Sequence, residues 1–129
     1  MVTIEETEVM LDEIAEELPV EFYEKLNGGI LLLPQAKMHP ERRADDLYIM
    51  GEYHHNFTMG RYIVIYYGSF EQVYGHLTEE KFKEQLRKTL RHEFTHHIES
   101  LAGDRGLEIK DARRMNAYRR RYSGNGDKL

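Results

Sequence analysis

The segment His92-Glu93-Phe94-Thr95-His96 carries the residues of this 129-residue chain that are best suited to chemistry. On an α-helix, residues four apart lie on one face about one turn apart, so the imidazoles of His92 and His96 can converge on one metal ion. Glu93 follows the first histidine, where its carboxylate can reach a water molecule bound to that ion. In the H-E-x-x-H motif two imidazoles bind zinc and the glutamate acts as general base. The spacing therefore predicts a zinc site.

The segment falls inside a long predicted helix that begins after Thr78 as N-cap. Its apolar side chains recur at helical spacing and form one row, namely Phe82, Leu86, Leu90, Phe94, Ile98 and Leu101. At about 100° per residue, His92 and His96 fall nearly opposite this row. We therefore expect the helix to bury its apolar row and to turn the two histidines toward a cleft. The alternative is a helix that merely carries two surface histidines.

The adjacent His97 points about 100° away from His96, toward the apolar row. We expect a structural role for it, with its ring hydrogen-bonded to a backbone carbonyl or a carboxylate.

A catalytic zinc usually has three protein ligands and one open position for water. Glu99 lies on the same helix face as His96, one turn beyond it, and is our first candidate for the third ligand. Its alternative role is to orient a ligating imidazole. Further acids follow Gly103, where we expect the helix to stop, and they can fold back onto the site. Asp104 ranks next after Glu99, and the others are Glu108 and Asp111.

Several helices and strands must position this segment. Thr3 and Glu6 form a capping-box pattern for a first helix that Pro19 ends, and a short helix is expected over residues 20–26. Strands are predicted at residues 30–33, at 47–53 and, most clearly, at 61–68, which is β-branched and aromatic throughout. The polar residues 35–46 are interpreted as a surface loop.

An arginine-rich last helix is expected over residues 107–122, paired with the acidic first helix, and residues 123–129 are read as a flexible tail. The pattern indicates an α+β fold in one domain, residues 1–129: a small mixed sheet against the long motif helix, with N- and C-terminal helices.

Composition narrows the classes of function. The formal charge of −5 argues against nucleic-acid binding, and the absence of cysteine restricts metal ligands to His, Asp, Glu or water. No apolar run approaches the roughly 20 residues that span a bilayer. The first residues also lack the basic and apolar regions of a signal peptide. We expect a cytoplasmic protein without membrane association, present as a monomer or weak oligomer.

The chain resembles the small bacterial zincin-like metallopeptidases, a family of uncharacterised predicted zinc proteases. The resemblance covers most of the chain, and its most specific element is the doubled histidine in Thr89-Leu90-Arg91-His92-Glu93-Phe94-Thr95-His96-His97. It implies a minimal zincin fold with the motif helix at its centre. The family pattern continues as H-x-x-G-x-x-D, but here Glu99 and Ala102 occupy the glycine and aspartate positions. His92, Glu93 and His96 therefore match the family, whereas the third ligand does not.

These observations predict a metallopeptidase that acts on a peptide or protein substrate with Zn²⁺ as cofactor and Glu93 as general base. His54 or Tyr66 is a candidate for stabilising the oxyanion, while a surface role is the alternative for His54 and His55. The strand at residues 61–67 is either an edge for an extended peptide or an ordinary strand of the sheet core. The competing hypotheses are a non-catalytic zincin-like domain that binds a metal or a partner, and a purely structural zinc site.

Overall fold

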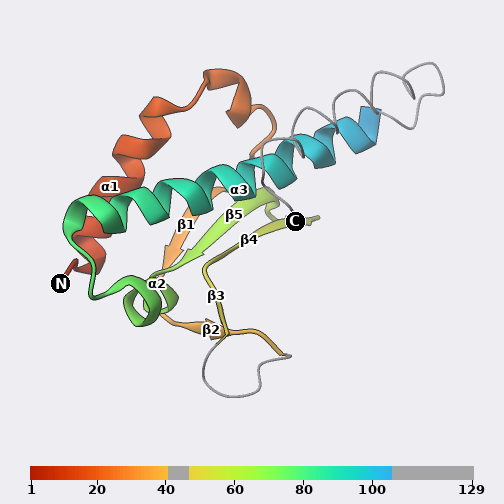
Figure 1. Ribbon diagram of the computed structural model, residues 1–129. Helices are drawn as coiled ribbons and strands as arrows, with labels where there is room; N and C mark the ends of the chain where they lie inside the picture. Colours follow the sequence, from red (N-terminus) through yellow and green to blue (C-terminus); the bar gives the residue numbers. More distant parts are fainter. Residues whose placement is uncertain (41–46, 106–129) are drawn as a thin grey trace.

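The structure is a computed structural model that describes residues 1–40 and 47–105. This part of the chain has an α+β fold in which a long helix packs on a small mixed sheet (Figure 1). The elements, in chain order, are α1 (Ile4–Glu17), the 3-10 helix η1 (Val20–Tyr23), β1 (Gly29–Leu33), β2 (Lys37–Met38), β3 (Tyr48–Ile49), β4 (Gly51–Asn56), β5 (Gly60–Tyr66), α2 (Tyr67–Tyr74) and α3 (Glu79–Arg105).

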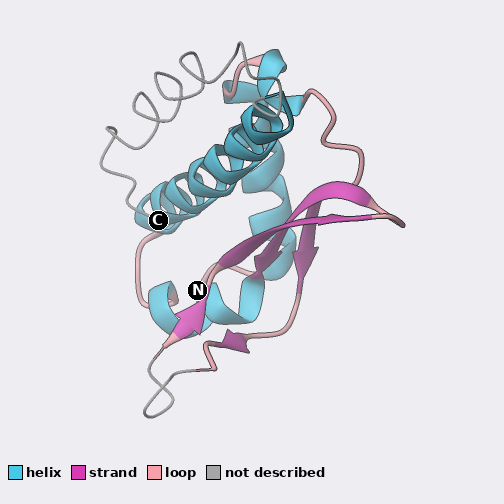
Figure 2. Ribbon diagram, turned by 90° about the vertical axis from the view of Figure 1, so that its right-hand side faces the viewer, coloured by secondary structure: helices cyan, strands magenta, loops and turns pink. Residues whose placement is uncertain are grey.

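The main sheet has the strand order β1-β5-β4, so β5 is its central strand (Figure 1). Figure 2 shows the strands beside the long helix. β5 pairs in parallel with β1, placing Leu31 opposite Val64, and antiparallel with β4, placing Tyr53 opposite Ile63. Of the two interpretations of residues 61–67, the sheet edge is therefore wrong and the sheet interior is confirmed. A strand that is aromatic and β-branched on both faces is typical of a sheet interior, and in this sheet the edge strands are β1 and β4.

The core lies between one face of this sheet and the helices α1 and α3. Ile63 and Ile65 of β5 are fully buried and pack against the apolar row of α3. That row is buried as predicted: Phe82, Leu86, Leu90 and Phe94 are at most 1% exposed, and Ile98 and Leu101 are below 10%. Met10, Leu11 and Ile14 of α1 complete the same cluster. The 3.6-residue period of α3 thus fixes which of its faces meets the sheet.

The first helix begins as the sequence predicts. The Thr3 hydroxyl accepts a hydrogen bond from the Glu6 backbone N–H at 3.1 Å, and the Glu6 carboxylate accepts one from the Thr3 N–H at 2.8 Å. Both bonds of the capping box satisfy N–H groups that have no partner inside the helix.

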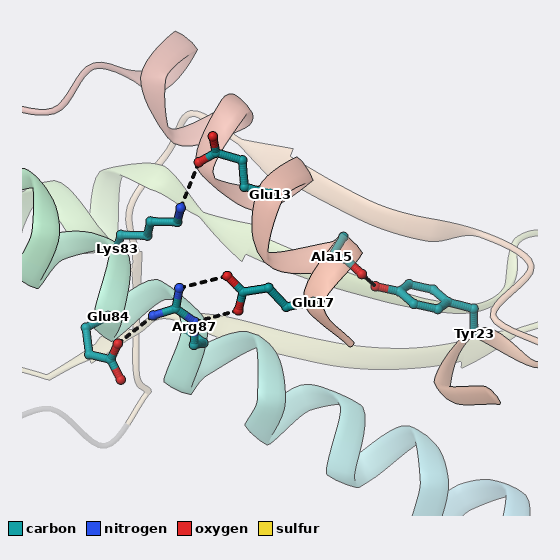
Figure 3. A network of polar contacts seen from close by, with 7 residues as sticks. All are labelled: Glu13, Ala15, Glu17, Tyr23, Lys83, Glu84 and Arg87. Atoms are coloured by element: carbon teal, nitrogen blue, oxygen red, sulfur yellow. Dashed lines mark hydrogen bonds and ion pairs between the residues drawn. The ribbon is translucent and has the colours of Figure 1, made fainter. Parts of the chain in front are cut away.

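Ion pairs fasten α1 to the first half of α3 (Figure 3). Glu13 Oε1 lies 2.7 Å from Lys83 Nζ, and Glu17 accepts hydrogen bonds from Arg87 at 2.8 and 3.0 Å. The acidic first helix was expected to pair with the arginine-rich helix at residues 107–122, which lies outside the described residues. In the described part, its partners come from α3 instead.

Several boundaries differ from the prediction. The second helix is a short 3-10 turn, η1, and the expected loop at 35–46 contains β2, which pairs with β3. α3 continues through Gly103 to Arg105, so the predicted stop is wrong. Glycine within a helix costs about 1 kcal/mol relative to alanine but does not end it, and Asp104 in the last turn is ion-paired with Arg61 of β5.

The helix α2 was missed because residues 61–68 read as one continuous strand. The strand ends at Tyr66, and α2 begins at the next residue. Gly68 explains the turn, since a Cβ at this position would lie 2.4 Å from the backbone nitrogen of Ala36. Its N–H also donates to the Gln35 carbonyl at 3.1 Å. Glycine therefore allows the chain to leave the sheet against the segment that enters β2. Within the described part of the chain, no helix is long and apolar enough to cross a membrane.

Leu90 provides a test of the core. It is fully buried at the centre of the α3 row, so Leu90→Ala removes apolar contacts and leaves a cavity. We expect the free energy of unfolding to fall by about 2–5 kcal/mol, measured by urea denaturation. The matched control is Val9→Ala, because Val9 is 57% exposed on α1 and should change stability little. A loss below about 1 kcal/mol for Leu90→Ala would contradict the packing described here.

Candidate metal centre

The predicted site residues lie together in one pocket between α3 and the edge strand β4. The pocket has a volume of about 840 Å³. From α3 it is lined by His92, Glu93, His96, Glu99 and Ser100, and from the other side by His39, Gly51, Glu52, Tyr53 and His54. The helical face opposite the apolar row therefore opens onto a cavity, as the sequence predicted.

His92 and His96 form the pair of imidazoles in this pocket. Their ring centroids lie 4.8 Å apart and their planes are nearly perpendicular, at 86°. The His96 side chain is 35% exposed, so its ring is accessible from the pocket. Two neighbouring imidazoles with access to solvent are a donor set that suits zinc, which accepts nitrogen ligands at about 2.0–2.1 Å.

Glu93 lies at the border between the buried face of α3 and the pocket. The residue is only 5% exposed, yet it lines the cavity beside both histidines. A buried carboxylate in this position is suited to exchanging a proton with a water molecule held in the pocket.

The third ligand is not determined by the described residues. In residues 1–40 and 47–105, no group of three or more potential ligands is arranged to hold a metal ion. Glu99 lines the pocket, with Oε1 4.0 Å from His96 Nδ1. Asp104 instead pairs with Arg61 and does not line the pocket, while Glu108 and Asp111 lie outside the described residues. The described part thus supplies two imidazoles, the buried Glu93 carboxylate and one neighbouring carboxylate.

His97 has the structural environment that we expected. It is fully buried, and its Nε2 donates a hydrogen bond to the Glu24 backbone carbonyl at 2.8 Å. Its Nδ1 lies 2.7 Å from the hydroxyl of Tyr53 on β4. Burial lowers the pKa of His97, and the nearby Arg61 lowers it further, so the neutral imidazole is favoured. Both ring nitrogens are engaged, which leaves neither for a metal.

A second polar cluster, centred on Glu52, was not anticipated from the sequence. The Glu52 carboxylate accepts hydrogen bonds from Lys37 at 2.7 Å, Tyr66 at 2.7 Å and His54 at 3.0 Å. Burial raises the pKa of Glu52, but these three bonds outweigh that effect, so the pKa lies below its usual value. The alternation of β4 puts Glu52 and His54 on one face, two residues apart, and this was the available signal.

The candidates for oxyanion stabilisation have different positions. His54 lines the pocket, where its ring stacks on Tyr62 with centroids 5.1 Å apart. Tyr66 is buried and donates its hydroxyl to Glu52, and burial together with that bond raises its pKa. It does not line the pocket, and neither does the exposed His55. Of the three, only His54 has access to the site.

Fold and site together define an α+β protein with a histidine-lined pocket beside a helix. The structure is similar to a conserved hypothetical protein (TTHA0227) from Thermus thermophilus, with a TM-score of 0.66 and 32% sequence identity. The similarity covers 79% of this chain and 99% of that protein, so this chain belongs to the same family. No protein-family model and no curated protein matches the sequence.

The Glu52 cluster predicts a pH dependence of stability. A carboxyl whose pKa is lowered by folding stabilises the protein fully above its unfolded pKa, near 4.5, and this contribution is lost as pH falls through the lower folded value. Glu52→Gln should therefore be less stable than the wild type at about pH 7, with the difference shrinking toward about pH 3. Urea denaturation across this range measures the effect. Tyr66→Phe removes one donor and should show a smaller pH dependence than the wild type, whereas a constant difference between Glu52→Gln and wild type would contradict the assignment.

Proposed function

We propose that the protein is a zinc-dependent peptidase with a minimal zincin-like fold. The observation that supports this proposal best is the meeting of His92, Glu93 and His96 in one pocket, with the two imidazoles adjacent and the carboxylate buried beside them. In this proposal His92 and His96 hold Zn²⁺. Glu99 is the first candidate for the third ligand, after a change of its side-chain conformation.

Each residue has a definite task in the proposed reaction. A bound zinc ion lowers the pKa of a coordinated water and polarises a carbonyl group. Glu93 takes a proton from the attacking water and later delivers it to the leaving amine. Because Glu93 is only 5% exposed, this proton transfer is shielded from bulk solvent. The electrostatic interactions of the Glu93 carboxylate are stronger in such an environment.

The edge strand β4 favours a peptide as substrate. Gly51, Glu52, Tyr53 and His54 of β4 line the pocket, and β4 pairs with a neighbour on one side only in the main sheet. An extended peptide can add to such an edge through backbone hydrogen bonds. This arrangement would hold a scissile bond beside the α3 histidines.

A second candidate function is a non-catalytic zincin-like domain that binds a metal or a partner. One observation favours this function: the described residues present no complete set of three metal ligands. The two functions differ in what the site must do, since binding requires the histidines and catalysis also requires Glu93.

Metal binding is tested through His96. The wild type, stripped of metal and then dialysed against zinc, should bind about one equivalent, measured by atomic emission of the protein. His96→Ala should bind much less because it removes one of the two imidazoles. His55→Ala is the matched control, since His55 is exposed and lies away from the pocket. Equal zinc content in all three proteins would refute the site.

Catalysis is tested through Glu93. Glu93→Gln should retain zinc while its hydrolysis of fluorescein-labelled casein falls by about 10²–10⁴-fold, because the amide cannot accept the proton. Glu80→Gln, an exposed change on the same helix, should leave the rate unchanged. A zinc-loaded wild type that cleaves no labelled casein or peptide library would favour the binding domain over the peptidase.

A further inference from the structure

His97 is held at both ring nitrogens by elements outside its own helix. Nε2 meets the backbone carbonyl of Glu24, just after η1, and Nδ1 meets the hydroxyl of Tyr53 on β4. A carbonyl oxygen can only accept, so Nε2 carries the proton, and in the neutral ring Nδ1 accepts from Tyr53. The geometry therefore selects one tautomer and one ring orientation for this side chain.

A buried arginine also bonds to the Tyr53 hydroxyl that contacts His97. Arg61 of β5 is 5% exposed and donates through Nη1 to the Tyr53 hydroxyl at 3.2 Å. The same guanidinium donates to the Ser100 hydroxyl and to the Asp104 carboxylate, both on α3. Tyr53 thus donates to His97 and accepts from Arg61, and α3 is tied to β4 and β5 at three successive turns. Tyr53 and Ser100 also line the candidate metal pocket.

These bonds limit the rotation of α3 about its own axis. Phe94, one turn before His97 on the same side, packs against Phe22 at 5.8 Å and Tyr23 at 5.1 Å between ring centroids. Apolar contacts of this kind tolerate small rotations because they are non-directional. Hydrogen bonds weaken steeply once their angles depart from linearity. The polar bonds of His97, together with those of Arg61 to Ser100 and Asp104, are therefore the directional part of the α3 contact.

We infer that His97 is a positioning residue for the metal centre: clamped between Glu24 and Tyr53, it fixes the rotation of α3 and so directs His92 and His96 into the pocket. His97 directly follows His96, so a rotation that displaces one displaces the other. His97 thus acts on the metal centre through its neighbour His96. This inference rests on the proposed zinc site and assigns to His97 neither metal contact nor substrate contact.

The experiment measures zinc affinity separately from stability. The zinc Kd is obtained by competition with a chromophoric chelator, and the free energy of unfolding of the metal-free protein by urea denaturation. His97→Phe keeps a ring but loses both hydrogen bonds, and should raise the Kd about tenfold or more, as the loss of a partner that orients a ligand does. His97→Gln keeps one donor and one acceptor and should recover most of the affinity.

Two further variants make the result specific. Phe82→Leu is a buried change near the start of α3, remote from the pocket residues, and should lower stability without changing the zinc Kd. Tyr53→Phe removes the hydroxyl that donates to His97 and accepts from Arg61, and should raise the Kd even if His97→Phe does not fold.

The outcomes separate this inference from the proposed function. Wild-type protein that binds no zinc would refute both. Wild-type protein that binds zinc, together with His97→Phe and Tyr53→Phe variants of unchanged Kd, would leave the zinc site standing and overturn the positioning role. A Kd that rises equally in Phe82→Leu would also overturn it, because affinity would then simply follow stability.

Discussion

The packing of the α3 apolar row against Ile63 and Ile65 is the contact on which the rest of the molecule depends. It joins the longest helix to the central strand and excludes water from both. His92 and His96 lie on the side of α3 opposite the apolar row, so burial of the row turns both histidines toward the pocket. The depth of the pocket is set by the same contact, since β4 is hydrogen-bonded to β5 and lies beside α3. Hydrophobic burial thus stabilises the packing of α3, and the hydrogen bonds of His97 fix the rotation of α3 about its axis.

The two sides of the pocket differ in kind. The helical side offers groups that can bind a metal and move a proton, namely two imidazoles and a buried carboxylate. The strand side offers a backbone edge, the His54 imidazole and a carboxylate, Glu52, that already accepts three hydrogen bonds. A carboxylate that already accepts three hydrogen bonds is a poor base and a poor ligand, because these bonds stabilise its charge. The candidate metal ligands and Glu93 therefore lie on the helical side, and His54, the candidate for oxyanion stabilisation, lies across the cavity.

The helical half of the site could be predicted from the sequence, because its information is local. The regular spacing of the apolar row and the four-residue separation of His92 and His96 depend only on helix geometry. The contacts of the strand half are between distant residues. Glu52 and Lys37 are brought together by the β4–β5 and β2–β3 pairings, and Arg61 meets Asp104 only because α3 runs past Gly103. Local patterns carry no information on such pairings, so Arg61, Tyr53 and Glu52 were not singled out.

The parallel pairing of β1 with β5 has a consequence for how the molecule folds. Leu31 and Val64 are partners, so this pairing closes the long loop between them, whereas β4 and β5 are joined by a tight turn. Loop closure makes distant pairing slower than local pairing. The β4–β5 hairpin therefore forms readily before β1 joins it. Apart from His39, the strand side of the pocket belongs to this hairpin. Until β1 joins, the second edge of β5 is open to strands of other molecules, so this pairing protects the chain from aggregation. β4 keeps an unpaired edge beside the pocket in the folded protein.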